Sequence, residues 1–166
     1  MAANMFVKIS DIPGDATEEV HDKWIVISSC GWNVARAVDM TDLGSTQRGH
    51  ANSNFGKVTV ASELGVASAK LMLSVANGTV RPLIEIHQCR SGESASAGLE
   101  PYLIWKLKDV VIDSYDVSGG ADSIPSETWS LAYTSIEVEY KSTDQASGKL
   151  TKENDFKWDL QKGKVA

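Results

Sequence analysis

The chain has 166 residues, of which 42% are hydrophobic and 23% charged, and its formal net charge is −6. This composition is ordinary for a globular protein. The length predicts a single domain, residues 1–166, able to bury roughly 70% of its unfolded surface. The negative charge argues against a basic footprint for nucleic acid. No run approaches the roughly 20 apolar residues that span a bilayer, so we expect neither nucleic-acid binding nor a membrane anchor.

The N-terminal fifteen residues have no basic start, no apolar core and no cleavage site. We therefore expect no cleaved secretory signal. The protein should fold in the cytosol, or leave by a route that reads no such signal. The two cysteines, Cys30 and Cys89, lie inside apolar runs and are predicted to be buried free thiols, as is usual outside oxidising compartments.

The first predicted strand is Met5–Ile9, and turn residues follow it. The next is Trp24–Val34, where apolar residues occupy both faces: Trp24 starts one alternating set, while Ile25 and Ile27 lie on the other face. A strand that is apolar on both faces must be covered on both. The cover comes either from its own domain or from another subunit.

Residues 39–54 form the longest stretch without periodicity, rich in Gly, Ser, Thr, Asn and Asp. A loop of this length in a compact domain is usually functional or disordered. A strand is predicted at 55–61. The only helix is predicted at 62–77, with Ser62 as N-cap, a packing stripe of Leu64, Leu71 and Val75, and Asn77-Gly78 at its end.

After a strand at 79–90, two long segments carry the same irregularity. In Tyr102–Val117 and in Thr128–Tyr140, the apolar residues shift by one position partway along. The phase breaks lie at Lys108–Asp109 and Thr134–Ser135. Since side chains alternate across a strand, each shift moves the apolar set to the opposite face.

If these segments pair as a hairpin, the two breaks lie nearly level, and both strands bend together from one sheet into another. This predicts a β-barrel or a β-sandwich. A polar turn at 143–154 and a last strand at 156–160 complete a mainly β fold of about seven strands and one flanking helix.

Catalytic and metal-binding patterns are missing from the sequence. His21, His50 and His87 are far apart, and no H-E-x-x-H motif, cysteine pair or calcium loop accompanies them. We interpret these histidines as solvated or at the edge of the core. The five tryptophans lie mainly at strand positions that predict burial. The sequence therefore predicts no enzyme activity and no cofactor.

In order, the segments resemble the Hcp family, the haemolysin-coregulated tube proteins of bacterial type VI secretion. The resemblance rests on motifs spread over the whole chain: MFVKISDIPGD at 5–15, IVISSCGW at 25–32, LMLSVANGT at 71–79, YLIWKLKDVVI at 102–112, ETWSLAY at 127–133, IEVEY at 136–140 and FKWDL at 156–160. The chain departs from the family pattern at Asn33, where a Gly is common, and the loop at 39–54 does not match residue by residue.

The resemblance implies a β-barrel subunit of a hexameric ring. Rings stack into a tube inside a contractile sheath, carry a VgrG-type spike at the tip, and can hold effector cargo in the lumen. The expected partners are therefore further copies of the chain, the spike, the sheath and cargo. The protein would be cytoplasmic before firing and then secreted into the extracellular space or a target cell.

Two sets of residues are candidates for assembly. Asp39, Asp42, Arg48 and His50 give the long loop charges of both signs, suited to ring-to-ring contacts that form and release. On the doubly apolar strand, the candidates for a subunit contact or a lumen wall are Ile25, Ile27, Ser29 and Gly31. Two alternatives to a tube subunit are a monomeric β-barrel that binds a small apolar ligand between tryptophan walls, and an enzyme whose site is assembled from separated Asp, Glu and His residues.

Overall fold

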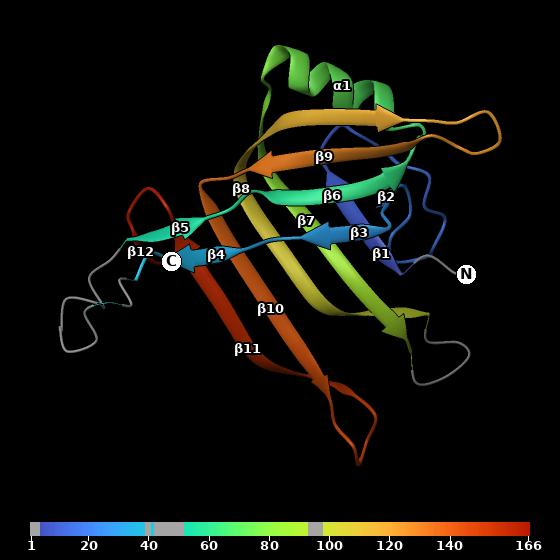
Figure 1. Ribbon diagram of the computed structural model, residues 1–166. Helices are drawn as coiled ribbons and strands as arrows, with labels where there is room; N and C mark the ends of the chain where they lie inside the picture. The colour runs from blue at the N-terminus through green and yellow to red at the C-terminus, as the bar shows by residue number, and fades with distance from the viewer. Residues whose placement is uncertain (1–3, 39–40, 42–51, 93–97) are drawn as a thin grey trace.

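The computed structural model describes residues 4–38, 41, 52–92 and 98–166. In this part of the chain the fold is mainly β with one helix, α1, at Ser68–Asn77 (Figure 1). The strands are β1 Met5–Ile9, β2 Ile25–Val26, β3 Ser29–Gly31, β4 Val34–Arg36, β5 Ser53–Phe55, β6 Val58–Glu63, β7 Val80–Ser91, β8 Leu99–Ser118, β9 Ser126–Ala132, β10 Ser135–Thr143, β11 Leu150–Asp159 and β12 Lys164–Val165.

The strand pairings wrap around a single large core. β7 pairs with β1 and β8, β1 pairs with β2, β8 pairs with β9, β9 with β6, and β6 with β3. Residues 25–31 carry β2 and then β3, so this one segment joins the two ends of the path. β10 and β11 extend the sheet from the first half of β8, beyond the wrapped part (Figure 1).

The two phase breaks are level, as predicted. In β8, Lys108 pairs with Ser135 of β10, whereas Val111 pairs with Ala132 of β9. Between them Asp109 has a φ of 49°, and Thr134 donates from its backbone N–H to the Lys108 carbonyl at 3.0 Å. β8 therefore bends where its neighbour changes from β10 to β9. The segment that pairs with β8 is divided at the same level into these two strands.

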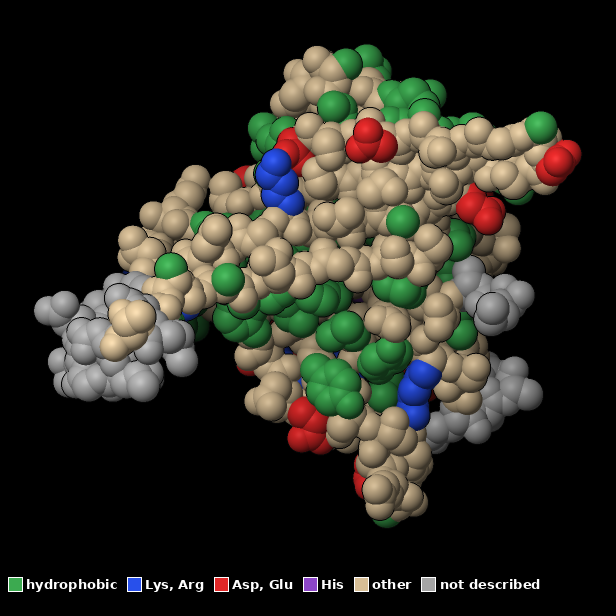
Figure 2. Space-filling model, viewed as in Figure 1, with side chains coloured by type: hydrophobic (Ala, Val, Ile, Leu, Met, Phe, Trp, Pro, Cys, Tyr) green, Lys and Arg blue, Asp and Glu red, His purple; other side chains and the backbone are tan. Residues whose placement is uncertain are grey.

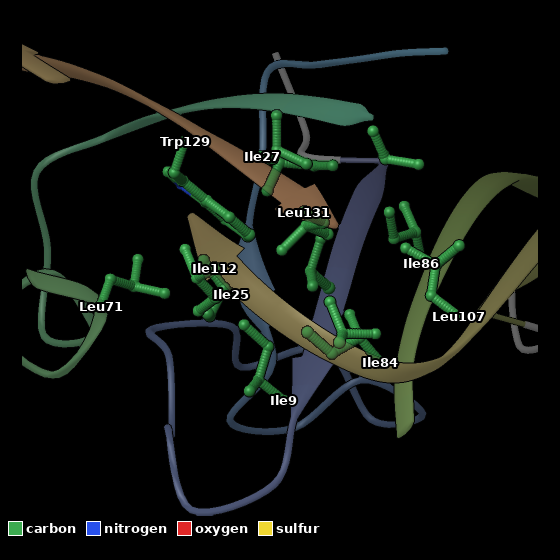
Figure 3. Close-up of a cluster of buried hydrophobic side chains, with 14 of the residues drawn as sticks. Ile9, Ile25, Ile27, Leu71, Ile84, Ile86, Leu107, Ile112, Trp129 and Leu131 are labelled. Atoms are coloured by element: carbon green, nitrogen blue, oxygen red, sulfur yellow. The ribbon is translucent and has the colours of Figure 1, made fainter. Parts of the chain in front are cut away.

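This bend lets one strand contribute to a continuous interior. Leu107, Trp129 and Leu131 are fully buried in the same cluster (Figure 3), and Trp105 packs against it. Three of these four residues are therefore buried together, whereas Trp105 is only partly buried at the edge of the cluster. Trp129 is the only one of the five tryptophans that is fully buried; the other four are partly exposed.

The predicted helix start was wrong. Ser62 belongs to β6, where it pairs with Glu127 of β9, and its hydroxyl donates to the Glu127 Oε1 at 2.7 Å. The ladder between β6 and β9 holds this residue extended, and α1 begins only at Ser68. Leu64 lies outside the helix and is 40% exposed, whereas Leu71 is buried and Val75 packs on the core. α1 lies beside β8 at one end of the fold (Figure 1).

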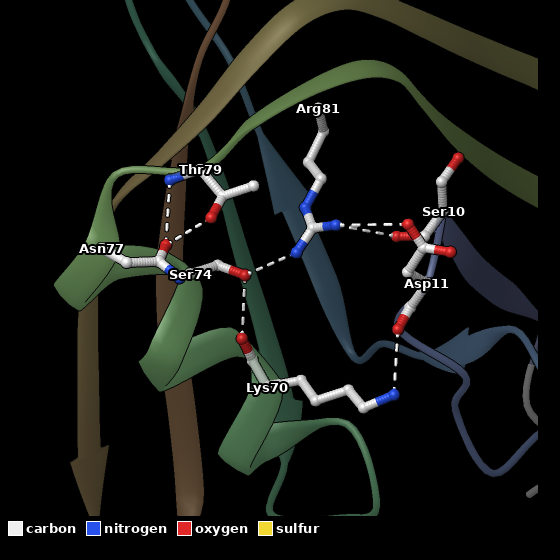
Figure 4. A network of polar contacts seen from close by, with 7 residues as sticks. All are labelled: Ser10, Asp11, Lys70, Ser74, Asn77, Thr79 and Arg81. Atoms are coloured by element: carbon white, nitrogen blue, oxygen red, sulfur yellow. Dashed lines mark hydrogen bonds and ion pairs between the residues drawn. The ribbon is translucent and has the colours of Figure 1, made fainter.

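Figure 4 shows how polar contacts fix the end of α1. Gly78 ends the helix in the left-handed conformation, with a φ of 66°, which a residue without Cβ adopts at little cost. The Arg81 guanidinium then donates to the Ser74 hydroxyl at 2.9 Å and to the Ser10 carbonyl at 3.3 Å. Lys70 donates to the Asp11 carbonyl at 3.0 Å, so the helix is tied to the end of β1.

Two further segments differ from the prediction. The expected strand at 24–34 is divided into β2, β3 and β4, because its successive parts pair with β1, β6 and β5. The expected turn at 143–154 is much shorter. β10 runs to Thr143 and β11 begins at Leu150, because this hairpin projects beyond the core and polar residues can occupy both of its faces.

Candidate assembly surfaces

The segment at 25–31 is divided between the core and the surface. Ile25 and Ile27 are 5% exposed and belong to the main core, so their side chains serve the interior of this chain. Ser29 and Gly31 are exposed on β3. Of the four predicted contact positions, these two face outward and remain candidates for a subunit contact or a lumen wall.

One face of the extended sheet carries an aromatic surface, which we define as Trp32, Phe55, Trp105, Phe156 and Trp158. Its rings form a connected set, with Trp32 centred 5.8 Å from Trp105 and 5.9 Å from Phe156, and Phe55 stacked 5.6 Å from Trp158. Phe156 is 38% exposed. Figure 2 shows hydrophobic side chains gathered below the β3–β4 segment, where β10 and β11 extend the sheet.

A hydrogen-bond relay holds the aromatic surface in place. The Trp32 indole N–H donates to the Tyr133 hydroxyl at 2.6 Å, and that hydroxyl donates to the Gly56 carbonyl at 2.8 Å. Gly56 approaches Asn33 so closely that a Cβ there would lie 2.0 Å from the Asn33 Oδ1. The orientation of Trp32 is therefore set by three segments that are distant in sequence.

The opposite face of β10 and β11 is charged. Lys157 lies 3.4 Å from Glu137 and 3.2 Å from Asp155, and Lys152 lies 3.7 Å from Glu139. Glu137 and Glu139 therefore lie on one face of β10. The hairpin thus presents an aromatic face on one side and a paired-charge face on the other, as strand alternation requires.

The outer edge of β11 is largely open. β12 pairs only with Trp158 and Asp159, and within the described residues no strand pairs with the rest of this edge. β3 likewise pairs only with β6 among the strands that the structure describes. Unpaired edges offer rows of backbone donors and acceptors to another chain.

A buried carboxylate joins β6, β8, β9 and the start of α1. Glu127 is 2% exposed and accepts hydrogen bonds from Ser62 and Ser68, both at 2.7 Å, and from the Tyr115 hydroxyl at 2.5 Å. Burial, together with this hydrogen bond and the carboxylate charge, raises the pKa of Tyr115 to about 12. Three donors compensate the buried charge, which makes this a structural node.

Beside this node lies a groove of about 680 Å³. Its lining includes Ile25, Ile27 and Ala67, with Asp15 and Glu63 contributing carboxylates. No tryptophan lines it. A monomeric barrel that binds a small apolar ligand was expected to have a pocket walled by tryptophans. This groove does not have that composition.

The structure brings together two histidines that are 66 positions apart. His21 is fully buried, and its Nε2 lies 3.0 Å from the His87 Nδ1, while its Nδ1 lies 2.5 Å from the Glu18 carboxylate. The interpretation of His21 as solvated or at the core edge was wrong. Its polar neighbours in sequence gave no local signal for burial, because the cover comes from Phe6 of β1 and from Trp24.

The other predicted residues, Asp39, Asp42, Arg48 and His50, lie outside the described residues. β4 and β5 flank them as a paired stem, with Val34 opposite Phe55. Within the described part of the chain, no group of three or more His, Cys, Asp or Glu residues is arranged to hold a metal ion. None of the helices described there is both long enough and apolar enough to cross a membrane.

In its described residues the chain is a mainly β protein with one helix, and its distinctive features are open strand edges and a partly exposed aromatic surface. The family model described as "Type VI secretion system effector, Hcp" matches residues 6–140. The chain therefore belongs to the Hcp family of type VI secretion proteins, as its motifs suggested, and this is not a known family of enzymes.

Individual proteins agree with this assignment. The chain is 23% identical to Protein hcp1 of Pseudomonas aeruginosa over 143 residues, which cover 85% of each protein. It matches a solved structure of a type six secretion system protein with a TM-score of 0.89 and 25% identity, over 99% of this chain and 100% of that one. Hcp1 from Salmonella typhimurium shares the fold, with a TM-score of 0.75 and 20% identity over the whole of both chains.

Proposed function

We propose that the chain, folded as one domain over residues 1–166, is the structural subunit of a type VI secretion tube. Six copies form a ring, rings stack inside the contractile sheath below a VgrG-type spike, and the lumen carries effectors. The subunit is made in the cytosol and leaves with the tube, without a cleaved signal peptide. Its role is mechanical, and no catalysis is assigned to it.

The observation that carries this proposal is the open edge of β11 beside the aromatic surface. An exposed edge strand next to exposed aromatic rings favours uncontrolled association in an isolated chain. A ring resolves both features, because each subunit covers one face of its neighbour and the repeated contact closes on itself. The exposed edge at Ser29 and Gly31 offers a second, different surface for such a head-to-tail contact.

The orientation of the subunit follows from the same argument. Strands that continue from one subunit to the next form the wall of the lumen, since a ring-wide sheet leaves no open edges. α1 then lies outside the lumen, packed on its own subunit through Leu71 and Val75.

The test compares two substitutions at Phe156. Phe156→Glu places a charge in the aromatic surface and should release subunits, whereas Phe156→Leu keeps an apolar side chain and should preserve the ring. Light scattering after size exclusion, at tens of micromolar protein, should give about six times the 17.9 kDa of one chain for wild type and Phe156→Leu. Phe156→Glu should give the mass of one chain with an unchanged circular dichroism spectrum.

Negative-stain images of the wild type should show rings with a central hole. A wild-type protein that stays at 17.9 kDa under these conditions would remove the basis of the proposal. A Phe156→Glu variant that still forms full rings would show that the aromatic surface is not the subunit contact.

A further inference from the structure

A small lobe, Gly14–Trp24, covers the outer face of β1 and β7, and the histidine pair joins the two, since His21 belongs to the lobe and His87 to β7. The lobe is held together by its own backbone: Gly14 N–H donates to the Lys23 carbonyl at 2.8 Å, and Ala16 N–H donates to the Trp24 carbonyl at 3.0 Å. Its underside forms a second, small core in which Ala16 packs with Phe6 of β1 and Cys89 of β7.

His21 is the polar connection between this lobe and the sheet. Its ring stacks on Phe6 at a centroid distance of 4.5 Å and meets the edge of Trp24 at 4.8 Å. Its Nε2 contacts the His87 Nδ1 at 3.0 Å across the lobe–sheet boundary. The Glu18 carboxylate, which belongs to the lobe itself, accepts a hydrogen bond from the His21 Nδ1 at 2.5 Å.

We propose that the His21–His87 pair is an acid-sensitive latch, which holds the Gly14–Trp24 lobe on the sheet near neutral pH and releases it when the pair takes up a further proton. The contact between the two rings needs an N–H on one nitrogen and a free lone pair on the other. A proton taken from water onto that lone pair leaves two N–H groups facing each other across 3.0 Å. The hydrogen bond is then lost, and the added positive charge stands in a buried site.

The charges around the pair decide the direction of the effect. Burial, together with the positive charges of His21, Lys106 on β8, Lys141 on β10 and Lys8 on β1, lowers the pKa of His87 to about 4. Two carboxylates face the pair: Glu18 from the lobe and, on β7, Glu85, whose Oε2 lies 3.5 Å from the His87 Nε2. The Cys89 thiol lies 3.7 Å from the His21 Nε2, and burial, with the charge of Glu18, raises its pKa to about 12, so it stays neutral.

The pH window follows from comparing the closed and open lobe. In an open lobe, His87 regains a pKa near 6.5, so protonation favours the open form as pH falls below about 6.5, and the effect levels off near 4, where the closed form also binds the proton. By linkage, the equilibrium constant for opening of the lobe then rises roughly thirtyfold as the pH falls from 7.5 to 5. Hydrogen bonds from His21 and Val20 outweigh burial and lower the pKa of Glu18, so this carboxylate remains charged through the window.

Opening would affect more than the lobe. The small core of Phe6, Ala16 and Cys89 would become exposed. Asp15 accepts from the Val66 N–H at 3.2 Å, so release of the lobe also frees the segment that leads into α1 and one wall of the groove. The latch rests on contacts within one chain and does not depend on ring assembly.

The test is hydrogen exchange of peptides covering 14–24, measured at pH 7.5 and 5.0 and corrected for the intrinsic pH dependence of exchange. The wild type should lose protection about thirtyfold at pH 5 in this segment, while peptides from β9 and β10 stay protected. His87→Asn keeps a hydrogen-bond acceptor near the Nδ1 position but cannot titrate, so it should remove the pH dependence. Glu127→Gln, at the other buried node, should leave it intact.

Equal protection of the lobe at both pH values in the wild type would overturn the latch, as would a His87→Asn variant that keeps the thirtyfold change. If His87→Asn fails to fold, nitrogen-15 spectra of the wild-type imidazoles give the same answer. They should show one ring nitrogen of the pair without a proton at pH 7.5 and its protonation with opening as pH falls. A pair that is already doubly protonated at pH 7.5 would contradict the inference.

Discussion

Trp129 stabilises the core in two ways, by burial of its ring and by a hydrogen bond from its indole N–H. Its ring is fully buried between β6, β8 and α1, and its indole N–H donates to the Ser62 hydroxyl at 3.1 Å. That hydroxyl in turn donates to Glu127. A large aromatic side chain fills the interior while its one polar atom enters a satisfied network.

We expect Trp129→Ala to lower the free energy of unfolding by about 3–5 kcal/mol, because it removes the ring and leaves a cavity. Trp129→Phe keeps most of the volume and loses the hydrogen bond, so its cost should be smaller by at least about 1 kcal/mol. Urea unfolding at one fixed protein concentration measures both, since assembly shifts apparent stability. A cost below about 1 kcal/mol for Trp129→Ala would show that the ring is not part of the core.

At this scale the sequence predicts burial better than it predicts partners. The alternation around Trp129 indicates an inward-facing side chain, and the structure agrees. The role of Ser62 was not predictable from its neighbours, because its partner depends on the register between β6 and β9, 65 residues away. Ser62 is a favourable residue for a helix N-cap, but the pairing of β6 with β9 holds it in a strand.

At the scale of elements, the bend in β8 is the feature that joins the wrapped sheet to the β10–β11 hairpin. Asp109 supplies it by adopting a φ of 49°, a left-handed conformation that Asp and Asn tolerate better than other residues with a Cβ. Its carboxylate accepts from the Thr134 hydroxyl at 3.2 Å. This contact and the backbone hydrogen bond from Thr134 to the Lys108 carbonyl together hold the bend in both strands.

Substitutions at Asp109 should therefore separate backbone preference from the side-chain contact. Asn tolerates the same conformation and keeps an acceptor, so Asp109→Asn should change the free energy of unfolding by less than about 0.5 kcal/mol. Asp109→Val should cost about 1–2 kcal/mol, because a β-branched side chain is strained at positive φ. Denaturant unfolding of the two variants side by side checks this, and equal stability would mean that the bend does not need the left-handed residue.

The predicted boundaries of elements were wrong where pairing with distant strands, and not local periodicity, decides where a strand begins and ends. The alternating run from Trp24 to Val34 reads as one strand, yet its parts pair with three different partners. The phase breaks were predictable because the signal lies inside each strand. The histidine pair was not, since it needs the Gly14–Trp24 lobe to fold back over β1 and β7.

At the scale of the whole molecule, the fold separates a closed interior from surfaces that a single chain leaves uncovered. The inward-facing residues of the wrapped strands are buried in the core. The aromatic surface packs on this core through Trp32, Trp105 and Trp158, and in the proposed ring a neighbouring subunit covers its exposed side and the edge of β11. The sequence indicated that the segment at 24–34 needs cover on both faces, from its own domain or from another subunit. Ile25 and Ile27 receive this cover from the core of their own chain.

In the proposed tube, rings must also stack on one another, and we predict that the loop at 39–54 provides this contact. The loop joins β4 to β5, whose stem is paired from Val34–Phe55 to Arg36–Ser53. Asp39, Asp42, Arg48 and His50 give it charges of both signs, which can fix the register of a contact through complementary pairing. A polar contact also suits rings that must remain separate until they are loaded, because a large dry interface would hold them together permanently.

The test is to replace residues 43–52 by a Gly-Ser turn, which leaves the pairs Val34–Phe55 and Arg36–Ser53 of the stem in place. We expect single rings of unchanged mass, no stacked tubes in electron micrographs, and loss of secretion. As a matched control, replacing the same number of residues by a Gly-Ser segment of equal length separates the effect of the side chains from that of the loop's reach. If the shortened protein still stacks and is secreted normally, the loop is only a connector and the ring-to-ring contact lies elsewhere.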